Sequence, residues 1–223
     1  MNERIAAVIP IRSLRGGKTR LAGALSPDER QALIERMLGV VVAATRATPL
    51  VGAVAVVTPD QAAAAFAKAL EPGIETVAQD AARPGLNPAL AIGRDWAVAR
   101  GAERLLTLSA DLPWLTPEAV GRLAATTADL AVARDRRGDG TNGLSLRLDA
   151  GGKAFRFAFG RASAWRHAAE ARRLGLSLQC IDLPATGFDL DEPDDLALLT
   201  DDGIAAPAMV GWRTAPCGMG AER

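Results

Sequence analysis

The sequence predicts an α/β protein with a mostly parallel sheet and helices on both of its faces. Short apolar segments alternate along the chain with longer amphipathic segments, and the short ones are closed by polar or Gly-containing loops. We predict strands at residues 5–11, 51–57, 74–77, 104–109, 130–134, 144–148 and 178–183. We predict helices at residues 27–46, 88–100, 163–174 and 193–199, with two more opening near residues 61 and 117. Strands separated by helices of this length are typical of parallel sheets buried on both faces.

Several helix starts are marked by capping sequences. Ser26 can cap a helix, Pro27 suits the first helical position, and Glu29 completes a capping box. Residues 58–61 repeat the combination of a cap and a proline before an Ala-rich segment, and residues 116–117 do so again. These signals indicate where the helices of the alternating pattern begin.

Length and charge limit the class of protein. With 223 residues, the chain favours one domain, which we place at residues 1–203, followed by an irregular, Gly- and Pro-containing tail at 204–223. Lys plus Arg number 26 and Asp plus Glu number 26, so a nucleic-acid binder, which usually carries a basic excess, is not indicated. No apolar run approaches the ~18 residues of a membrane span, and the first residues lack the features of a secretory signal. We therefore expect a cytoplasmic protein without a membrane partner, and a homodimer is left open.

A basic loop, residues 12–21, follows the first predicted strand. It carries Arg12, Arg15, Lys18 and Arg20. Residues 17–19 read Gly-Lys-Thr, as in a phosphate-binding P-loop, but that motif requires glycine where Arg12 stands. In an open parallel sheet, ligands bind beyond the carboxyl ends of the strands. The loop is therefore predicted to wrap a polyphosphate with backbone N–H groups and charge-assisted hydrogen bonds; the alternative is a solvated basic loop.

Acidic residues follow two other predicted elements. Asp111 comes just after the strand at 104–109, where a carboxylate can reach a hard cation such as Mg²⁺; the alternative is a cap for the next segment. Asp189 and Asp191 are two residues apart, so on an extended segment both face one side. Either one can complete a metal site with Asp111. Asp194 and Asp195 are interpreted as structural residues of a first helical turn.

Two further loops have the composition of ligand-binding loops. Residues 138–143 place Thr141 among three glycines. Residues 159–163 precede a predicted helix, so Ser163 and the first helical amides can bind a phosphate or carboxylate, and Arg161 can add donors. The alternative for Ser163 is an ordinary helix cap.

Two other polar side chains have different interpretations. Asn87, in the Gly-Leu-Asn sequence at residues 85–87, offers amide groups suited to a base edge or a ribose. His167 lies inside the predicted helix at 163–174 and is interpreted as a surface or packing residue rather than an acid–base catalyst.

Taken in order, these segments resemble the 2-phospho-L-lactate guanylyltransferase family. The resemblance covers about residues 4 to 200 and depends on the ordered set rather than on any one motif. It is carried by the basic loop ending Lys-Thr-Arg-Leu at 18–21, Leu-Ser-Pro-Asp-Glu-Arg at 25–30, Gly-Leu-Asn at 85–87, Ala-Asp-Leu-Pro at 110–113, Gly-Thr-Asn at 140–142, Phe-Gly at 159–160 with Ser163, and Asp-Leu-Asp at 189–191.

The resemblance implies a single-domain, nucleotidyltransferase-like (GT-A/Rossmann-like) fold and a guanylyltransferase of coenzyme F-420 biosynthesis. Such an enzyme couples GTP to a three-carbon phosphorylated acid and releases pyrophosphate. The acid is phosphoenolpyruvate, 3-phospho-D-glycerate or 2-phospho-L-lactate, and the cofactor is Mg²⁺. The substrate's phosphate is already ionised near neutral pH, so catalysis is expected to depend on positioning and charge stabilisation rather than on a general base.

The implied site divides into three groups of residues. The nucleotide is assigned to Arg12, Lys18, Arg20, Gly85 and Asn87; the acid to Thr141, Gly160, Arg161 and Ser163; and the metal to Asp111 with Asp189 or Asp191. Lys18, Arg20 and Asp111 are the predicted catalytic residues. The alternatives are another nucleotidyltransferase, a nucleotide-sugar glycosyltransferase of similar architecture, or a nucleotide-binding module without catalytic activity.

Overall fold

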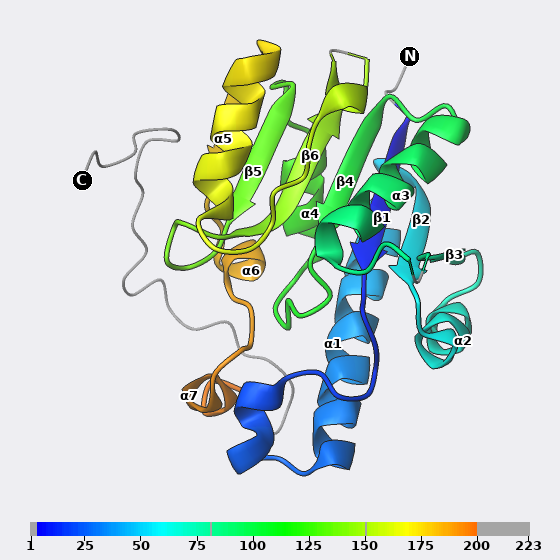
Figure 1. Cartoon of the computed structure of the whole chain (residues 1–223), viewed down its shortest axis with the longest axis vertical. Coiled ribbons are helices and arrows are strands. Elements are labelled where there is room, and N and C mark those ends of the chain that lie inside the picture. The colour runs from blue at the N-terminus through cyan, green and yellow to red at the C-terminus, as the bar shows by residue number, and fades with distance from the viewer. Residues whose placement is uncertain (1–3, 81, 150, 200–223) are drawn as a thin grey trace.

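The fold is built on one sheet with helices on both sides (Figure 1). The computed structural model describes residues 4–80, 82–149 and 151–199, so the predicted domain boundary at 203 and the tail at 204–223 lie outside the described residues. Within the described residues, seven strands have the order β3-β2-β1-β4-β6-β5-β7. The strands are β1 (Ile5–Pro10), β2 (Val51–Thr58), β3 (Glu75–Ala78), β4 (Arg104–Leu108), β5 (Leu130–Arg134), β6 (Thr141–Arg147) and β7 (Leu178–Ile181). The helices are α1 (Pro27–Arg46), α2 (Gln61–Leu70), α3 (Leu86–Ala99), α4 (Pro117–Ala124), α5 (Ser163–Leu174), α6 (Pro184–Gly187) and α7 (Pro193–Leu196), with short 3₁₀ turns η1 (Thr19–Gly23) and η2 (Gly152–Ala154).

Strand pairing explains where a ligand can bind. β1 pairs in parallel with β2 on one side and with β4 on the other. The strand order therefore changes direction at β1, because β2 and β3 lie on one side of it and β4 lies on the other. Ligands of open α/β sheets bind outside the carboxyl ends of the strands at such a switch point. β6 runs antiparallel to both β4 and β5 and pairs Gly143 with Leu108 and Thr141 with Arg134. The beginning of β6 therefore lies at the same edge of the sheet where β4 and β5 end.

The alternating residues of β1 divide the core into two layers. Ile5, Ala7 and Ile9 face the layer that contains buried residues of α1, α2 and α4. Ala6 and Val8 face the layer that contains buried residues of α3 and α5. Because the sheet is covered on both faces, β1 is apolar along its whole length, whereas β4 also buries Arg104 and Thr107.

Local signals correctly located several helix starts. Ser26 accepts a hydrogen bond from the Glu29 amide at 3.3 Å, and the Glu29 carboxylate accepts one from the Ser26 amide at 2.7 Å.

The prediction for β6 was wrong at its start, because the strand begins at Thr141 rather than at 144. Residues 141–143 are drawn into the sheet by pairing with β4 and β5, which no local pattern reveals. Ser163 is the first residue of α5 rather than its cap.

Some shorter elements also differ from the sequence-based expectation. α3 begins at residue 86 rather than 88, and the last helix ends at 196 rather than 199. The sequence analysis did not predict the 3₁₀ turn η1 or the four-residue helix α6. No helix within the described ranges combines the length and apolar character needed to cross a membrane.

Close packing of α3 on β1 yields the first prediction. A Cβ added at Gly93 would lie 2.5 Å from Cγ1 and 2.9 Å from Cγ2 of Val8. We expect Gly93→Ala to lower the free energy of unfolding by about 1–3 kcal/mol, because the helix must move off the sheet. In the control, Gly39→Ala in α1, the new Cβ meets Leu70 at an ordinary 3.7 Å. Denaturant unfolding measures both variants, and a Gly93→Ala protein as stable as the control would contradict this packing argument.

Candidate active site

Three cavities open at the carboxyl edge of the sheet, and Leu86 lines all of them. The large cavity measures about 650 Å³, the outer cavity about 300 Å³ and the loop cavity about 260 Å³. The large cavity is lined by Arg20, residues 135–137 and 139–142, residues 159–163, Asp189 and Asp191, among others. The outer cavity is lined by residues 10–12, Pro59, Gln79, Asp80, residues 84–86 and Ala89. The loop cavity is lined by residues 10–13, 17–18 and 109–111, among others.

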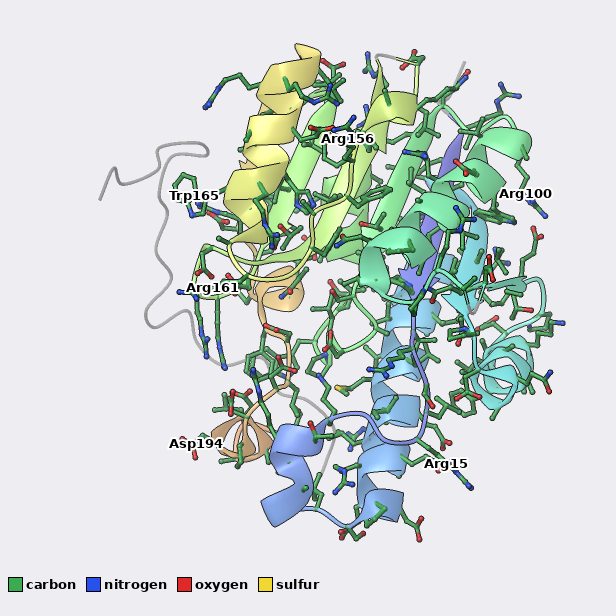
Figure 2. All side chains as sticks on the ribbon, in the orientation of Figure 1. Arg15, Arg100, Arg156, Arg161, Trp165 and Asp194 are labelled. Atoms are coloured by element: carbon green, nitrogen blue, oxygen red, sulfur yellow. The ribbon has the colours of Figure 1, made fainter. Side chains whose placement is uncertain are left out.

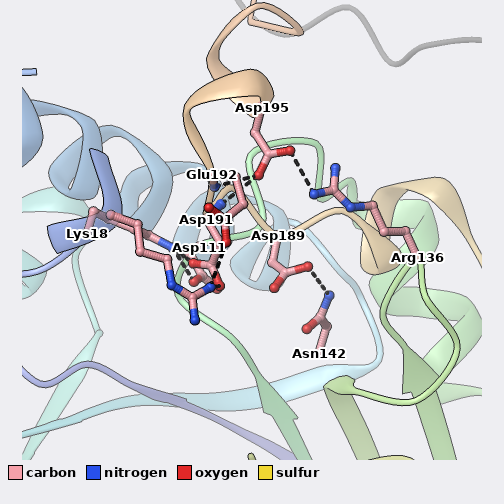
Figure 3. Close-up of polar contacts among 9 residues, drawn as sticks. Lys18, Asp111, Arg136, Asn142, Asp189, Asp191, Glu192 and Asp195 are labelled. Atoms are coloured by element: carbon pink, nitrogen blue, oxygen red, sulfur yellow. Dashed lines mark hydrogen bonds and ion pairs between the residues drawn. The ribbon is translucent and has the colours of Figure 1, made fainter. Parts of the chain in front are cut away.

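Lys18 joins two of the predicted acidic residues. Its Nζ lies 2.6 Å from Oδ2 of Asp111 and 2.7 Å from Oδ1 of Asp191 (Figure 3). Burial lowers the pKa of Lys18, but attraction to these two carboxylates outweighs burial, and the pKa is raised overall. Lys18 also has a left-handed backbone, with φ of 52°, which is unusual for a residue with a side chain. Strained backbone of this kind gathers at functional sites, and here it directs the ammonium group between two carboxylates.

The acidic segment that carries Asp189 and Asp191 is fixed by its own hydrogen bonds. Asp189 accepts a hydrogen bond from Nδ2 of Asn142 at 3.3 Å. Asp195 accepts from the Asp191 amide at 2.9 Å and pairs with Arg136 at 2.7 Å (Figure 3). The prediction that Asp195 is structural is therefore confirmed, because its carboxylate holds the turn on which Asp191 stands.

The acidic residues form an environment suited to a hard cation. Burial, with the charges of Asp111 and Asp191, raises the pKa of Asp189 to about 6. Oxygen ligands and excess negative charge fit Mg²⁺, which usually keeps several waters and binds one or two carboxylates together with substrate phosphates. Among the described residues, no group of three or more His, Cys, Asp or Glu side chains is arranged as a complete metal site. An Mg²⁺ ion bound by one or two of these carboxylates could take its other ligands from water and from substrate phosphates.

The basic loop is held in place at both ends. Asp60 caps α2 with one oxygen, and its other oxygen accepts hydrogen bonds from Oγ of Ser13 at 2.7 Å and from the Leu14 amide at 3.1 Å. At the far end, Arg20 pairs with Glu192 at 2.8 Å. Residues 12, 13, 17 and 18 of the loop line the loop cavity, whereas Arg15 and Thr19 are exposed to solvent.

The predicted acid-binding residues gather around the large cavity. Thr141 reaches it from the start of β6, and Gly160, Arg161 and Ser163 reach it from the loop that opens α5. Arg161 and Asp194 lie on the same side of the molecule, below α5 in Figure 2. Ala162, between Arg161 and Ser163, has a left-handed φ of 54°. The loop before α5 therefore shares with the Lys18 loop a strained residue beside the cavities.

Two arginines of the large cavity were missed by the sequence analysis. Arg136 and Arg137 line it directly after β5. The guanidinium of Arg136 lies 5.0 Å from the ring centroid of Phe188, which stacks on Trp114 at 3.8 Å. Their position just beyond a predicted strand was the available signal, because that is where ligand-binding residues of such sheets lie.

The predicted nucleotide residues separate into two groups. Arg12 lines the outer and loop cavities, and Gly85 lines the outer cavity, where its carbonyl accepts a hydrogen bond from Gln79 at 2.8 Å. Asn87 is not among the residues that line these cavities; it accepts a hydrogen bond from the Phe159 amide at 2.8 Å and donates one to the Phe159 carbonyl at 3.3 Å. The amide groups that favoured Asn87 as a nucleotide contact are therefore engaged in joining α3 to the loop before α5.

Comparisons with known proteins agree on one family. The model of the family described as "Guanylyl transferase CofC like" matches residues 5–205. The phosphoenolpyruvate guanylyltransferase of Sphaerobacter thermophilus is 40% identical over 198 residues, covering 85% of this chain and 89% of that protein. The phosphoenolpyruvate guanylyltransferase of Conexibacter woesei is 37% identical over 200 residues, covering 87% of this chain and 86% of that protein.

Solved structures confirm the predicted nucleotidyltransferase-like fold. A nucleotidyl transferase from Methanothermobacter aligns with a TM-score of 0.64 at 18% identity, covering 87% of this chain and 94% of that chain. A 4-diphosphocytidyl-2C-methyl-D-erythritol synthase aligns with a TM-score of 0.60 at 17% identity, covering 88% of this chain and 96% of that chain. At these identities the likeness concerns the fold alone.

The raised pKa of Asp189 predicts a pH-dependent stability. Between about pH 4 and 6, the native state keeps a proton on Asp189 that the unfolded chain has lost, so native stability falls as the pH rises through this range. The Asp189→Asn variant has no carboxyl group to titrate at this position, so it does not lose stability in this way as the pH rises. In buffer without divalent cations, we expect the variant to be more stable than the wild type by about 1–3 kcal/mol near pH 8 and equal to it near pH 4.

Thermal unfolding at several pH values measures this difference. The control is Asp194→Asn, which removes an exposed carboxylate in the first turn of α7. A variant less stable than the wild type near pH 8 would mean that the charge of Asp189 stabilises the fold.

Proposed function

Because the chain belongs to the CofC-like guanylyl transferase family, we propose that it transfers the guanylyl group of GTP to phosphoenolpyruvate in coenzyme F-420 biosynthesis. Pyrophosphate is the second product. The observation that carries the proposal is the ion cluster of Lys18, Asp111 and Asp191. Lys18 and Asp111 line the loop cavity, whereas Asp191 lines the large cavity. The cluster therefore joins the walls of two cavities, as a site that transfers a group between two substrates requires.

The arrangement of the cavities suggests an orientation for GTP. Its base would occupy the outer cavity, between Pro10 and Pro84 and beside Gly85. Its phosphates would extend along the basic loop past Arg12 toward Lys18, where backbone N–H groups and cations offset their charge. The α-phosphorus then lies near the ion cluster. Since GTP is a nucleotide of the cytoplasm, this substrate also supports a cytoplasmic location.

The large cavity suits the acid. Phosphoenolpyruvate carries a carboxylate and a phosphate, so its site needs donors for two anions within a small volume. Arg136, Arg137 and Arg161 supply cationic donors, and Thr141 and Ser163 supply hydroxyls. Four aspartates line the same cavity, so the arginines also offset negative charge there; with the hydroxyls they support a small acid that carries two anionic groups.

The reaction would proceed by in-line displacement. A phosphate oxygen of phosphoenolpyruvate attacks the α-phosphorus of GTP, a new P–O bond forms, and the bond to the bridging oxygen of the β-phosphate breaks as pyrophosphate leaves. No proton is transferred, so no general base is needed. Lys18 and the basic loop hold the phosphates in place and stabilise the added charge. Mg²⁺ held by Asp111, with Asp189 or Asp191 and phosphate oxygens, would stabilise charge on the reacting phosphates.

A product-identified assay tests this function. GTP is offered with phosphoenolpyruvate, 3-phospho-D-glycerate or 2-phospho-L-lactate, and pyrophosphate and the guanylylated acid are measured with and without a chelator. We expect kcat/KM for phosphoenolpyruvate to exceed the others by at least about tenfold, and the chelator to stop turnover. A preference for another of the three acids would reject phosphoenolpyruvate but keep guanylyl transfer. The absence of pyrophosphate with every acid, or a preference for CTP or UTP over GTP, would reject guanylyl transfer itself.

Two conservative variants test the placement of the acid. Thr141→Val and Ser163→Ala each remove a hydroxyl that lines the large cavity. A hydrogen bond to a charged group contributes roughly 1.5–3 kcal/mol. In each variant we therefore expect the KM for the acid to rise about tenfold or more while the KM for GTP stays nearly constant. The control is Thr76→Val in β3, which lines none of the three cavities. Losses confined to the KM for GTP would mean that the acid lies elsewhere.

A further inference from the structure

The single histidine of the chain is buried next to the large cavity. His167 is fully buried in α5, which confirms that it is a packing residue, but both of its ring nitrogens have polar partners. Nε2 lies 3.0 Å from the backbone nitrogen of Ala158, and Nδ1 lies 3.1 Å from Oγ1 of Thr141. The ring therefore connects the loop before α5 to the first residue of β6.

These two contacts determine the tautomer of the ring. An amide N–H can only donate, so Nε2 of His167 must present its lone pair to Ala158. A neutral imidazole then carries its proton on Nδ1 and donates it to Oγ1 of Thr141. Consistent with a neutral ring, burial and the charge of Arg166 lower the pKa of His167 to about 4, although Glu170 opposes the shift.

The tautomer in turn determines the role of the Thr141 hydroxyl. Because Oγ1 accepts the proton of Nδ1, the hydroxyl's own hydrogen must be directed elsewhere. Within residues 4–80, 82–149 and 151–199, no hydrogen bond from this hydroxyl to a second acceptor is found. Thr141 lines the large cavity, so that hydrogen is available to a bound molecule.

We propose that His167 is a positioning residue that holds the Thr141 hydroxyl as a hydrogen-bond donor toward an anion in the large cavity. A hydroxyl in solution can turn its hydrogen in any direction, whereas here one lone pair of Oγ1 is occupied by Nδ1–H, so the hydrogen is directed away from the ring and toward a ligand. Preorganised donors favour an oxyanion and disfavour a ligand group that must itself donate. That the anion belongs to the three-carbon acid rests on the proposed function; the orientation of the hydroxyl does not.

The surroundings of His167 keep its ring in this orientation. The rings of Phe155 and Phe159 lie 5.7 and 4.8 Å from the imidazole, measured between centroids. Asn87 holds the backbone of Phe159 through two hydrogen bonds, which fixes the neighbouring Ala158 amide as well. A flip of the imidazole would leave the partly buried N–H of Ala158 without its acceptor, so these contacts favour one orientation and one tautomer of the ring.

NMR of the wild-type protein tests the tautomer without any assay of activity. Since the chain has one histidine, its ring nitrogens can be assigned without variants. We expect a neutral ring protonated at Nδ1 across the pH range in which an exposed histidine titrates. A ring protonated at Nε2, or one that titrates normally, would overturn the proposal.

Two substitutions separate the role of each ring nitrogen. In His167→Asn, the amide NH₂ can take the place of Nδ1 and keep donating to Thr141. In His167→Gln, the amide oxygen can take the place of Nε2 and keep accepting from Ala158, but the donor to Thr141 is lost. We expect the Gln variant to raise the KM for phosphoenolpyruvate about three- to tenfold over the wild type, with the KM for GTP unchanged. We expect the Asn variant to have a KM for phosphoenolpyruvate close to that of the wild type.

A double-mutant cycle distinguishes positioning from general packing. In the Thr141→Val background there is no hydroxyl to orient, so His167→Asn and His167→Gln should give the same KM for the acid. A difference between them that persists without the hydroxyl would overturn the proposal, as would equal KM values for the two in the wild-type background. If phosphoenolpyruvate is not a substrate, the proposed function fails, but the NMR measurement still tests the role of His167. A ring protonated at Nδ1 supports that role, and a ring protonated at Nε2 overturns it.

Discussion

The site depends on the neutralisation of negative charge at the carboxyl edge of the sheet. Asp111, Asp189 and Asp191 meet there, and burial, together with the charges of the other two carboxylates, raises the pKa of Asp189. Lys18, placed by a strained backbone, offsets two of these charges with one ammonium group. In the proposed function, a cation carried by a substrate would offset the remaining negative charge of these carboxylates.

The antiparallel strand β6 gives the site its second half. A wholly parallel sheet would place the beginning of each strand at the far edge, away from the ligands. Because β6 runs against β4 and β5, Thr141 and Asn142 begin their strand at the edge where Asp111 and Arg136 follow theirs. One reversed strand thus brings the donors of the large cavity beside the carboxylates of the ion cluster.

Buried and partly buried polar contacts then fix the loops that surround the cavities. Asn87 holds Phe159, His167 joins Ala158 to Thr141, and Asp60 holds the start of the basic loop. Each of these side chains bonds a backbone or hydroxyl group that is at least partly shielded from water. Loops positioned in this way have fixed donors before a ligand arrives, which reduces the cost of ordering them on binding.

The sequence alone determined the alternation of strands and helices, the capping box at Ser26, the cations of the basic loop and the acidic residues that follow two elements. These features depend on hydrophobic periodicity and on residue types at fixed short spacings, which are local. Only the tertiary structure decided that β6 begins at Thr141, that Arg136 and Arg137 line the cavity, and that Asn87 and His167 accept hydrogen bonds from the amides of residues 159 and 158. Strand direction and partner choice are determined by contacts between residues far apart in the chain, and a single sequence does not display those contacts.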